Sequence, residues 1–438
     1  MNLPEYVTQC LNALEDAGFA AYAVGGCVRD LYLGREPHDY DLCTEALPEQ
    51  TETVFQDRRL VLAGKKHGTV GVVIPEGVVE ITTFRTEGDY TDNRHPDSVE
   101  FVRNIEEDLA RRDFTVNAMA WSPKRGFADP FGGREDLQAG ILRAVGDPEK
   151  RFREDSLRIL RGVRFAVRYN LRLDPATERA MFELVPLMEN LARERVFDEL
   201  CALLPTVKAE DLIRFAPVIC GVIPELAPTV DFDQRSPHHA YDLFTHIAKV
   251  VENTPADLVL RWTALLHDTG KIATFTTDST GRGHFYGHDK VGAEIADGIL
   301  RRLKASTALR EQVVLLIGRH MTRLEPNKKV LRRWISRLGL ETVWQLLAIQ
   351  QADMGSKGGE DPVADAYFRE ISDTLREVEE ENGCLSLKDL AINGHDLMGI
   401  GITGKEIGQK LSILLEKVLE EELPNKKDVL LQYVKEET

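Results

Sequence analysis

The hydrophobic pattern of the sequence changes near Asp147. Before this residue, short apolar runs alternate with glycine and proline turns, and the runs at 21–24, 69–74 and 78–84 have the length and composition of strands. After it, apolar residues recur at helical spacing, and glycine and proline only separate the segments. The sequence therefore predicts an α+β class: a head with a mixed β-sheet and helices, followed by an all-α neck, body and tail.

Chain length and local composition divide the molecule further. At 438 residues the chain is longer than a single hydrophobic core usually supports. Weak boundaries fall in the polar, proline-containing segment 229–239 and in the glycine-rich segment 355–361. We expect a head at residues 1–145, a neck at 146–228, a body at 229–360 and a tail at 361–438.

The charge distribution is uneven. A net charge of −17 argues against a uniformly basic surface for nucleic acid, because phosphate contacts require lysine and arginine. The segment from Lys150 to Arg168 nevertheless contains seven basic residues, which predicts a local basic face on an acidic body. No apolar run reaches the roughly 20 residues that span a bilayer, and the first residues lack a secretory signal. We expect a cytoplasmic protein that does not contact membranes.

The head contains two carboxylates with the spacing of a metal site. Asp39 and Asp41 are two residues apart, and on a strand such side chains leave the same face. Two carboxylates can share divalent ions, as phosphoryl transfer requires: one Mg²⁺ activates an attacking 3′-hydroxyl, and a second neutralises the triphosphate and the leaving pyrophosphate. Taken alone, the pattern Asp-x-Asp is more typical of a solvated turn.

A glycine pair upstream favours the phosphoryl-transfer interpretation. Gly25 and Gly26 lie where a predicted strand enters a predicted helix, which exposes backbone N–H groups and a positive helix end to phosphate. Arg29 is placed to reach the same phosphates. The combination of this turn with the carboxylate pair predicts a site for a nucleoside triphosphate.

Several strings, in a fixed order between residues 20 and 205, resemble the class II tRNA nucleotidyltransferase and poly(A) polymerase family, in its bacterial type. The resemblance implies Mg²⁺-dependent transfer of nucleoside monophosphates from CTP and ATP to an RNA 3′ end, with Asp39 and Asp41 as the metal-binding carboxylates. Glu80, on the following strand, is a candidate third carboxylate, and a surface salt bridge to Arg85 is the alternative. The matching strings are Gly25–Asp30 with Asp39–Asp41, Arg111–Ala118, Asp129–Gly133, Glu154–Arg158, and Arg193–Arg195 with Glu199.

A ridge of charged residues in the predicted neck suits selection of the base. A carboxylate can accept a hydrogen bond from the exocyclic amine of C or A, while an adjacent arginine donates one to the ring nitrogen. U and G present the reversed pattern of donors and acceptors, so such a pair excludes them. The resemblance assigns this protein-made template to Asp155 and Arg158, with Arg112, Arg161 and Arg164 near the nucleotide. A solvated charged helix face is the alternative, because Asp155 and the arginines at 158, 161 and 164 recur every three residues.

The body contains a second set of candidate ligands. The string His267–Lys271, in a helical setting, resembles the HD phosphohydrolase superfamily. This resemblance implies a second divalent metal (Mg²⁺, Mn²⁺, Ni²⁺ or iron) and hydrolysis of phosphate esters, such as cyclic phosphates on damaged RNA ends. HD domains also occur as inherited bodies of tRNA nucleotidyltransferases, with or without activity, and an ordinary surface His-Asp pair is a further alternative. The candidate ligands are His246, His267, Asp268 and Asp353, with His288 and His320 as possible additions.

Three functions remain open from the sequence. The first is complete CCA addition to the tRNA acceptor arm, which the polar loop at residues 88–96 favours, because the resemblance links such a loop to the switch from C to A addition. The second is a poly(A) polymerase or a partial CC- or A-adding enzyme. The third is an HD phosphohydrolase whose head only binds RNA. The sequence does not distinguish a monomer from a homodimer.

Overall fold

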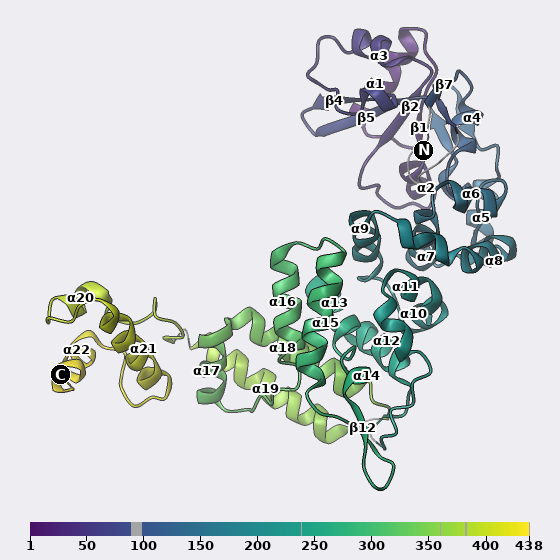
Figure 1. Cartoon of the computed structure of the whole chain (residues 1–438). Coiled ribbons are helices and arrows are strands. Elements are labelled where there is room, and N and C mark those ends of the chain that lie inside the picture. Colours follow the sequence, from purple (N-terminus) through teal and green to yellow (C-terminus); the bar gives the residue numbers. More distant parts are fainter. Residues whose placement is uncertain (89–98, 238, 360, 382, 438) are drawn as a thin grey trace. The chain divides into compact units, whose positions relative to one another are not determined.

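The computed structural model of the chain describes residues 1–88, 99–237, 239–359, 361–381 and 383–437 (Figure 1). The chain folds into two compact units, one made of Met1–Val207 and Arg214–Pro224, the other of Lys208–Ile213 and Glu225–Thr438. The first unit thus contains the head and most of the neck, and the second contains the body and the tail. The finer division into four domains stays a prediction.

A seven-stranded mixed sheet forms the centre of the head, in the order β3-β4-β5-β2-β1-β8-β9. β2 and β5 pair in parallel, whereas the other neighbouring strands are antiparallel. The predicted strands at 21–24 and 69–74 are confirmed residue for residue, and the run at 78–84 forms β5 one position earlier. The strands are β1 (Ala21–Val24), β2 (Asp41–Thr44), β3 (Leu60–Val61), β4 (Thr69–Ile74), β5 (Gly77–Thr83), β8 (Ala120–Ser122) and β9 (Gly126–Ala128).

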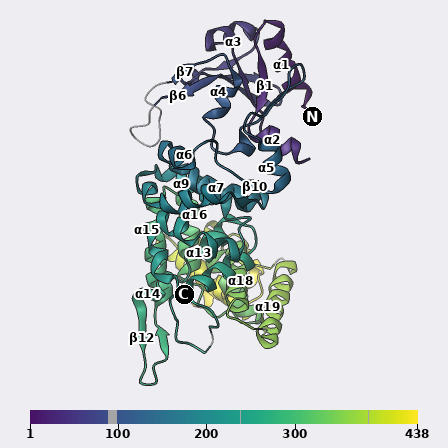
Figure 2. The same ribbon diagram turned by 90° about the vertical axis from the view of Figure 1, so that its right-hand side faces the viewer.

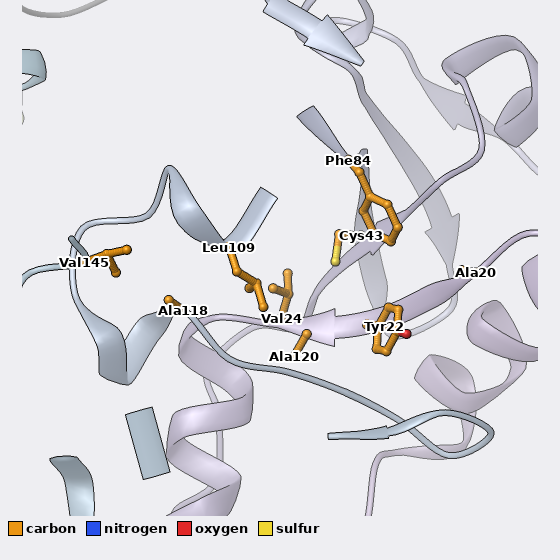
Figure 3. Close-up of a cluster of buried hydrophobic side chains, with 9 residues drawn as sticks. All are labelled: Ala20, Tyr22, Val24, Cys43, Phe84, Leu109, Ala118, Ala120 and Val145. Atoms are coloured by element: carbon orange, nitrogen blue, oxygen red, sulfur yellow. The ribbon is translucent and has the colours of Figure 1, made fainter. Parts of the chain in front are cut away.

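One buried cluster fixes the two central strands of this sheet (Figure 3). Tyr22 and Val24 of β1 and Cys43 of β2 contribute to it, and Phe84 packs its ring against Tyr22 with centroids 6.2 Å apart. Leaving water drives these apolar side chains together. β1 leads directly into the glycine pair and β2 begins at Asp41, so the cluster positions both segments.

Short helices and two small strand pairs complete the first unit. The strand pairs are β6 with β7 and β10 with β11. Their bounds are β6 (Arg85–Glu87), β7 (Val99–Phe101), β10 (Ile141–Leu142) and β11 (Arg172–Leu173). The helices are α1 (Glu5–Asp16), α2 (Gly26–Tyr32), α3 (Pro48–Val54), α4 (Ile105–Ala110), α5 (Gly133–Ala139), α6 (Pro148–Glu154), α7 (Leu157–Tyr169), α8 (Pro175–Glu183), α9 (Arg193–Leu203) and α11 (Ala216–Val222).

Within its described residues, the second unit is helical apart from one hairpin, β12 (Phe275–Thr277) with β13 (Gly283–Phe285), which the sequence did not predict (Figure 2). The α+β class of the chain is confirmed, with this hairpin as an addition to the body. In the part of the chain that the structure describes, no helix combines the length and apolar character needed to cross a membrane. The helices are α10 (Ala209–Arg214, its last residue in the first unit), α12 (Leu243–Asn253), α13 (Leu258–Leu266), α14 (Lys271–Thr274), α15 (His288–Arg302), α16 (Thr307–Ile317), α17 (Lys328–Leu338), α18 (Leu340–Gly355), α19 (Pro362–Glu380), α20 (Gly394–Met398), α21 (Lys405–Leu419) and α22 (Lys427–Glu436).

Candidate functional sites

Three carboxylates gather at one end of β2. Asp39 lies just before this strand and Asp41 is its first residue, and both are exposed. Glu80 of β5 is the register partner of Asp41 on the parallel neighbour, so the two side chains leave the same face of the sheet. Desolvation raises the pKa of Asp41 from its ordinary value, and the negative charges of Asp39 and Glu80 raise it further. A divalent cation relieves repulsion of this kind, so the residues fit a metal site.

The head carboxylates are not drawn tightly together. Among the described residues, the groups of three ligand atoms that lie within 4.8 Å of one another are found in the body. The head site therefore has the ligand chemistry for a divalent ion, in an open arrangement of exposed side chains.

The glycine turn and Arg112 lie beside these carboxylates. Gly25 has a φ of +76°, and a Cβ atom at this position would come within 2.7 Å of Nη1 of Arg112. The turn therefore requires glycine both for its backbone and for the space of the guanidinium. The positive charge of Arg112 opposes the raised pKa of Asp41, which places this guanidinium near the carboxylates as well. Among described atoms, its buried Nε has no hydrogen-bond partner.

Arg29 lies beside the glycine turn and is held by other side chains, with its Nη2 3.6 Å from the position of a Cβ atom at Gly26. Its side chain is buried and donates to Asp30 at 2.9 Å, to Asn117 and to the hydroxyl of Tyr169. The guanidinium also lies 4.2 Å from the centroid of the Tyr169 ring. The structure thus brings Gly25, Arg112 and the carboxylates together, and it holds Arg29 beside the turn in a network that joins α2 to the end of α7.

Asp155 and Arg158 are each fixed by other residues. Asp155 lies between α6 and α7, and its carboxylate accepts from Nη1 and Nη2 of Arg195 at 3.3 and 2.7 Å. Arg158 is 7% exposed and donates to Glu154 at 2.8 Å and to the carbonyls of residues 151 and 111 at 3.1 and 3.0 Å. Both side chains are therefore held in defined positions, with a bidentate arginine on the carboxylate.

The other two arginines of the ridge share an acidic partner. Arg164 donates to Glu199 at 2.6 Å, and Arg161 lies 3.4 Å from Glu199 and 2.7 Å from Asp113. Burial acts to raise the pKa of Asp113, but the charge of Arg161 and a hydrogen bond from Asn117 outweigh it and lower this pKa to about 2. These carboxylates, with Glu154, offset much of the positive charge expected for the basic face.

Sequence reasoning missed the residues that hold the predicted ones. Asp113, Arg195 and Glu199 belong to the matching strings, but nothing in the sequence said which side chains they contact. Tyr169 had no distinguishing signal, because an aromatic residue at the end of a helix is usually a core residue. The loop expected at residues 88–96 lies, apart from Gly88, outside the described residues.

The body brings all its candidate ligands to one buried cluster. Nε2 of His246 lies 3.3 Å from Asp268 and 3.0 Å from Asp353, and Nε2 of His267 lies 3.1 Å from Asp268. On the other side of Asp268, His288 lies 3.5 Å from its Oδ1 and 3.3 Å from Nε2 of His320. Two triads with the spacing of metal ligands result, and Asp268 belongs to both: His246, His267, Asp268 and Asp268, His288, His320.

The orientation of these histidines suits metal binding. Each of the four contacts a backbone carbonyl through Nδ1, at 3.2 Å for His246, 2.8 Å for His267, and 2.7 Å for His288 and His320. Nε2 is thereby directed into the cluster, as in metal sites whose ligands are held by backbone oxygens. Burial, with the charge of His267, lowers the pKa of His320 to about 4 and keeps this ring in the neutral, metal-binding form.

Unsatisfied atoms in the cluster also fit a cation. Nε2 of His246, Nε2 of His267 and Oδ2 of Asp268 are buried without a hydrogen bond of normal geometry. Buried polar atoms of this kind are rare in folded proteins, and a bound cation is one arrangement that satisfies them. Sequence reasoning missed His239, whose ring lies edge-on to His246 with centroids 5.3 Å apart and whose Nδ1 is buried without a partner among described atoms.

Comparisons with known proteins agree with both units. Three protein-family models match: the poly A polymerase head domain at residues 21–143, the RNA and SrmB-binding site of polymerase A at 170–214, and tRNA nucleotidyltransferase domain 2 at 289–434. A crystal structure of the Bacillus stearothermophilus CCA-adding enzyme in complex with CTP is similar over 100% of this chain and 98% of that chain, with a TM-score of 0.72 and 28% sequence identity.

Curated relatives carry the same name. The CCA-adding enzyme of Geobacillus stearothermophilus is 48% identical over 219 residues, which cover 50% of this chain and 51% of that enzyme. The chain thus spans about half the length of the first relatives it matches. The CCA-adding enzyme of Ligilactobacillus salivarius is 38% identical over 276 residues, 60% of this chain and 68% of that enzyme. The chain therefore belongs to the family of the CCA-adding enzymes.

Proposed function

We propose that this protein adds C, C and A to the 3′ end of tRNA, using CTP and ATP, at the carboxylates of the head. The observation that carries the proposal is the approach of Asp39 and Glu80 to Asp41, beside the Gly25 turn and Arg112. The names of the relatives and the CTP complex of a similar structure support it. We propose that the tRNA acceptor arm is recognised by the shape of its A-form helix.

Membership of the family implies dependence on a divalent cation, and we propose Mg²⁺. Asp39 and Asp41 are the ligands, and Glu80 assists them or accepts the proton of the primer hydroxyl. A Mg²⁺ ion held by these carboxylates would neutralise the triphosphate and lower the pKa of the attacking 3′-hydroxyl. Arg112 is positioned to bind a phosphate oxygen, while the network of Arg29 keeps the glycine turn in place.

Base selection is assigned to the neck. Asp155 accepts from the exocyclic amine of C or A, and Arg158 donates to the adjacent ring nitrogen. Arg161 and Arg164 brace this region through Glu199. We propose that the chain works in the cytoplasm, with a head at 1–145, a neck at 146–228, an HD-type body at 229–360 and a tail at 361–438.

The decisive experiment is incorporation on tRNA that lacks CCA, resolved nucleotide by nucleotide. We expect CC with CTP alone and CCA with CTP and ATP. A product that stops at CC despite ample ATP would indicate a partial enzyme, and extension of generic RNA with ATP alone would indicate a poly(A) polymerase. Asp41→Asn should reduce incorporation by about 100-fold or more, since it removes a metal-binding charge. Asp57→Asn, at another exposed aspartate of the head, is the matched control and should retain activity.

A second function is favoured by the unsatisfied ligand atoms of the body. We propose that the cluster around Asp268 binds divalent metal and hydrolyses phosphate esters. Burial opposes protonation of His246, but the adjacent carboxylates of Asp268 and Asp353 raise its pKa to about 9, so metal must displace a proton and binds less tightly as the pH falls. Elemental analysis of the purified chain should find metal that Asp268→Asn loses. Retention of the same metal content by this variant would contradict the assignment.

A further inference from the structure

The sheet face that carries the head carboxylates continues beyond them as an apolar surface. The register partners that follow Asp41 across the sheet are Glu80 of β5, Gly71 of β4 and Val61 of β3. Residues paired in this way leave the same face of a sheet, so Gly71 and Val61 share the face of the carboxylates. Neighbouring strands lie about 4.8 Å apart, which places Val61 roughly 14 Å from Asp41 along this row.

Two exposed valines form this surface. Val78 lies two residues before Glu80 on the same strand, about 7 Å along it, and is 53% exposed. Val61 is 43% exposed. A Cβ atom on Gly71 would lie 2.9 Å from Cγ1 of Val78 and 3.1 Å from Cβ of Val61, so both valines close over this glycine. The two side chains therefore make one continuous apolar surface, and glycine within a strand is one mark of a place where a ligand comes close.

The order of the strands separates this surface from the phosphate-binding turn. β2 carries Asp41, with β1 on one side and β5, β4 and β3 on the other (Figure 1). β1 is antiparallel to β2, with Ala23 opposite Leu42, so Gly25, which follows β1, lies at the end where β2 begins. A triphosphate bound at Gly25 and Arg112 is therefore on the β1 side of Asp41, and the valines are on the β5 side.

The geometry of nucleotidyl transfer puts the RNA primer on the side of the valines. The attacking 3′-oxygen and the leaving pyrophosphate lie in line, on opposite sides of the α-phosphorus. With the pyrophosphate toward Gly25, the 3′-oxygen approaches from the side of Glu80, and the nucleotide that carries it lies on the adjoining surface. The base of this nucleotide changes as addition proceeds, so its site cannot depend on hydrogen bonds to one base. An aliphatic surface meets this requirement, because the burial of apolar area is non-directional.

We propose that Val61 and Val78 form the platform on which the sugar and base of the 3′-terminal nucleotide of the primer pack. The inference rests on the proposed addition of C, C and A, and it names the site that holds the end of the RNA during each addition. The ligand is a single-stranded RNA 3′ end, whatever base it carries.

The test measures single-nucleotide incorporation by full-length variants on two substrates: tRNA that lacks CCA, with CTP, and tRNA that ends in CC, with ATP. We expect Val78→Ser to lower kcat/KM for both RNAs by about 10-fold, the factor that burial of one valine contributes. The Kd for CTP with Mg²⁺, measured by calorimetry without RNA, should stay unchanged. Val61→Ser should act in the same direction, and because Val61 is two strands away from Glu80, its effect does not arise from displacement of that carboxylate.

Two further variants separate apolar contact from folding. Val78→Ile keeps the apolar surface and should retain the wild-type kcat/KM for both RNAs. Leu33→Ser, at a 37% exposed apolar residue that follows α2, is the matched control and should also retain it. The inference is overturned if Val78→Ser leaves kcat/KM for the RNAs unchanged, if it weakens CTP binding to the same extent, or if only one of the two additions is affected. Absence of CMP incorporation by the wild type would instead refute the proposed function on which the platform depends.

Discussion

At the scale of single residues, the predicted template depends on a salt bridge that the sequence did not indicate. Arg195 holds the Asp155 carboxylate with two hydrogen bonds. We predict that Arg195→Ala lowers discrimination between CTP and UTP by about 10- to 100-fold, because an unrestrained carboxylate no longer presents its acceptors in one position. Arg195→Lys should restore part of the discrimination. The measurement is kcat/KM for each nucleotide, and an equal loss for CTP and UTP would assign Arg195 a purely structural role.

The buried pair of Asp113 and Arg161 predicts a pH effect on stability. Because the folded-state pKa of Asp113 is about 2, below its ordinary 3.8, its contribution is complete above pH 4 and declines as the pH falls toward 2. Asp113→Asn lacks this titration. The difference in free energy of unfolding between the wild type and this variant should therefore shrink by about 1 kcal/mol between pH 7 and pH 3, as followed by urea unfolding. A difference that stays constant with pH would show that the pair does not titrate in this range.

The sequence could identify those site residues whose contacts are with residues close to them along the chain. Asp39 and Asp41 form a local pattern, whereas Glu80 becomes the neighbour of Asp41 through the parallel pairing of β2 with β5, two strands that are not consecutive in the sequence. The contact of Arg29 with phosphate stays a prediction, and the partners that hold its side chain, Asn117 and Tyr169, are 88 and 140 residues away in the sequence. Contacts of this kind depend on how helices pack, and no periodicity in the sequence records them.

At the scale of elements, the turn between β1 and α2 gives a comparison of two adjacent glycines. A Cβ atom at Gly25 meets Arg112 at 2.7 Å on a backbone with positive φ, whereas at Gly26 the nearest atom, Nη2 of Arg29, is 3.6 Å away. We predict that Gly25→Ala costs about 1–3 kcal/mol of stability and displaces Arg112, with loss of nucleotide incorporation. Gly26→Ala should change stability by about 0.5 kcal/mol or less. Thermal unfolding of both variants checks this, and equal destabilisation would contradict it.

The elements that the sequence predicted are those specified by local pattern. β1 and β4 are apolar runs that end at turn residues, so their bounds follow from composition alone. The hairpin of β12 and β13 was missed because its strands are three residues long and are mostly polar outside Phe275 and Phe285. The turn held by Asp278 defines this hairpin, and its hydrogen bonds become visible only in the folded chain.

At the scale of the whole molecule, the two proposed activities lie in different compact units, each with its own buried core. The carboxylates of the head belong to the first unit, and the cluster around Asp268 belongs to the second. Substitutions in one site should therefore leave the other intact. Asp268→Asn should add CCA at the wild-type rate, and Asp41→Asn should keep the metal content of the body.

The same separation predicts ligand-specific effects on unfolding. Calorimetry should show two transitions, and CTP with Mg²⁺ should raise the melting temperature of the first unit only. Mn²⁺ at about 100 times its dissociation constant should stabilise the second unit by about 2.7 kcal/mol, because metal bound only to the folded cluster shifts the equilibrium by mass action. Asp268→Asn should abolish the Mn²⁺ shift and retain the CTP shift. A single transition that both ligands displace would show that the units unfold together, and a Mn²⁺ shift that survives in Asp268→Asn would place the metal outside this cluster.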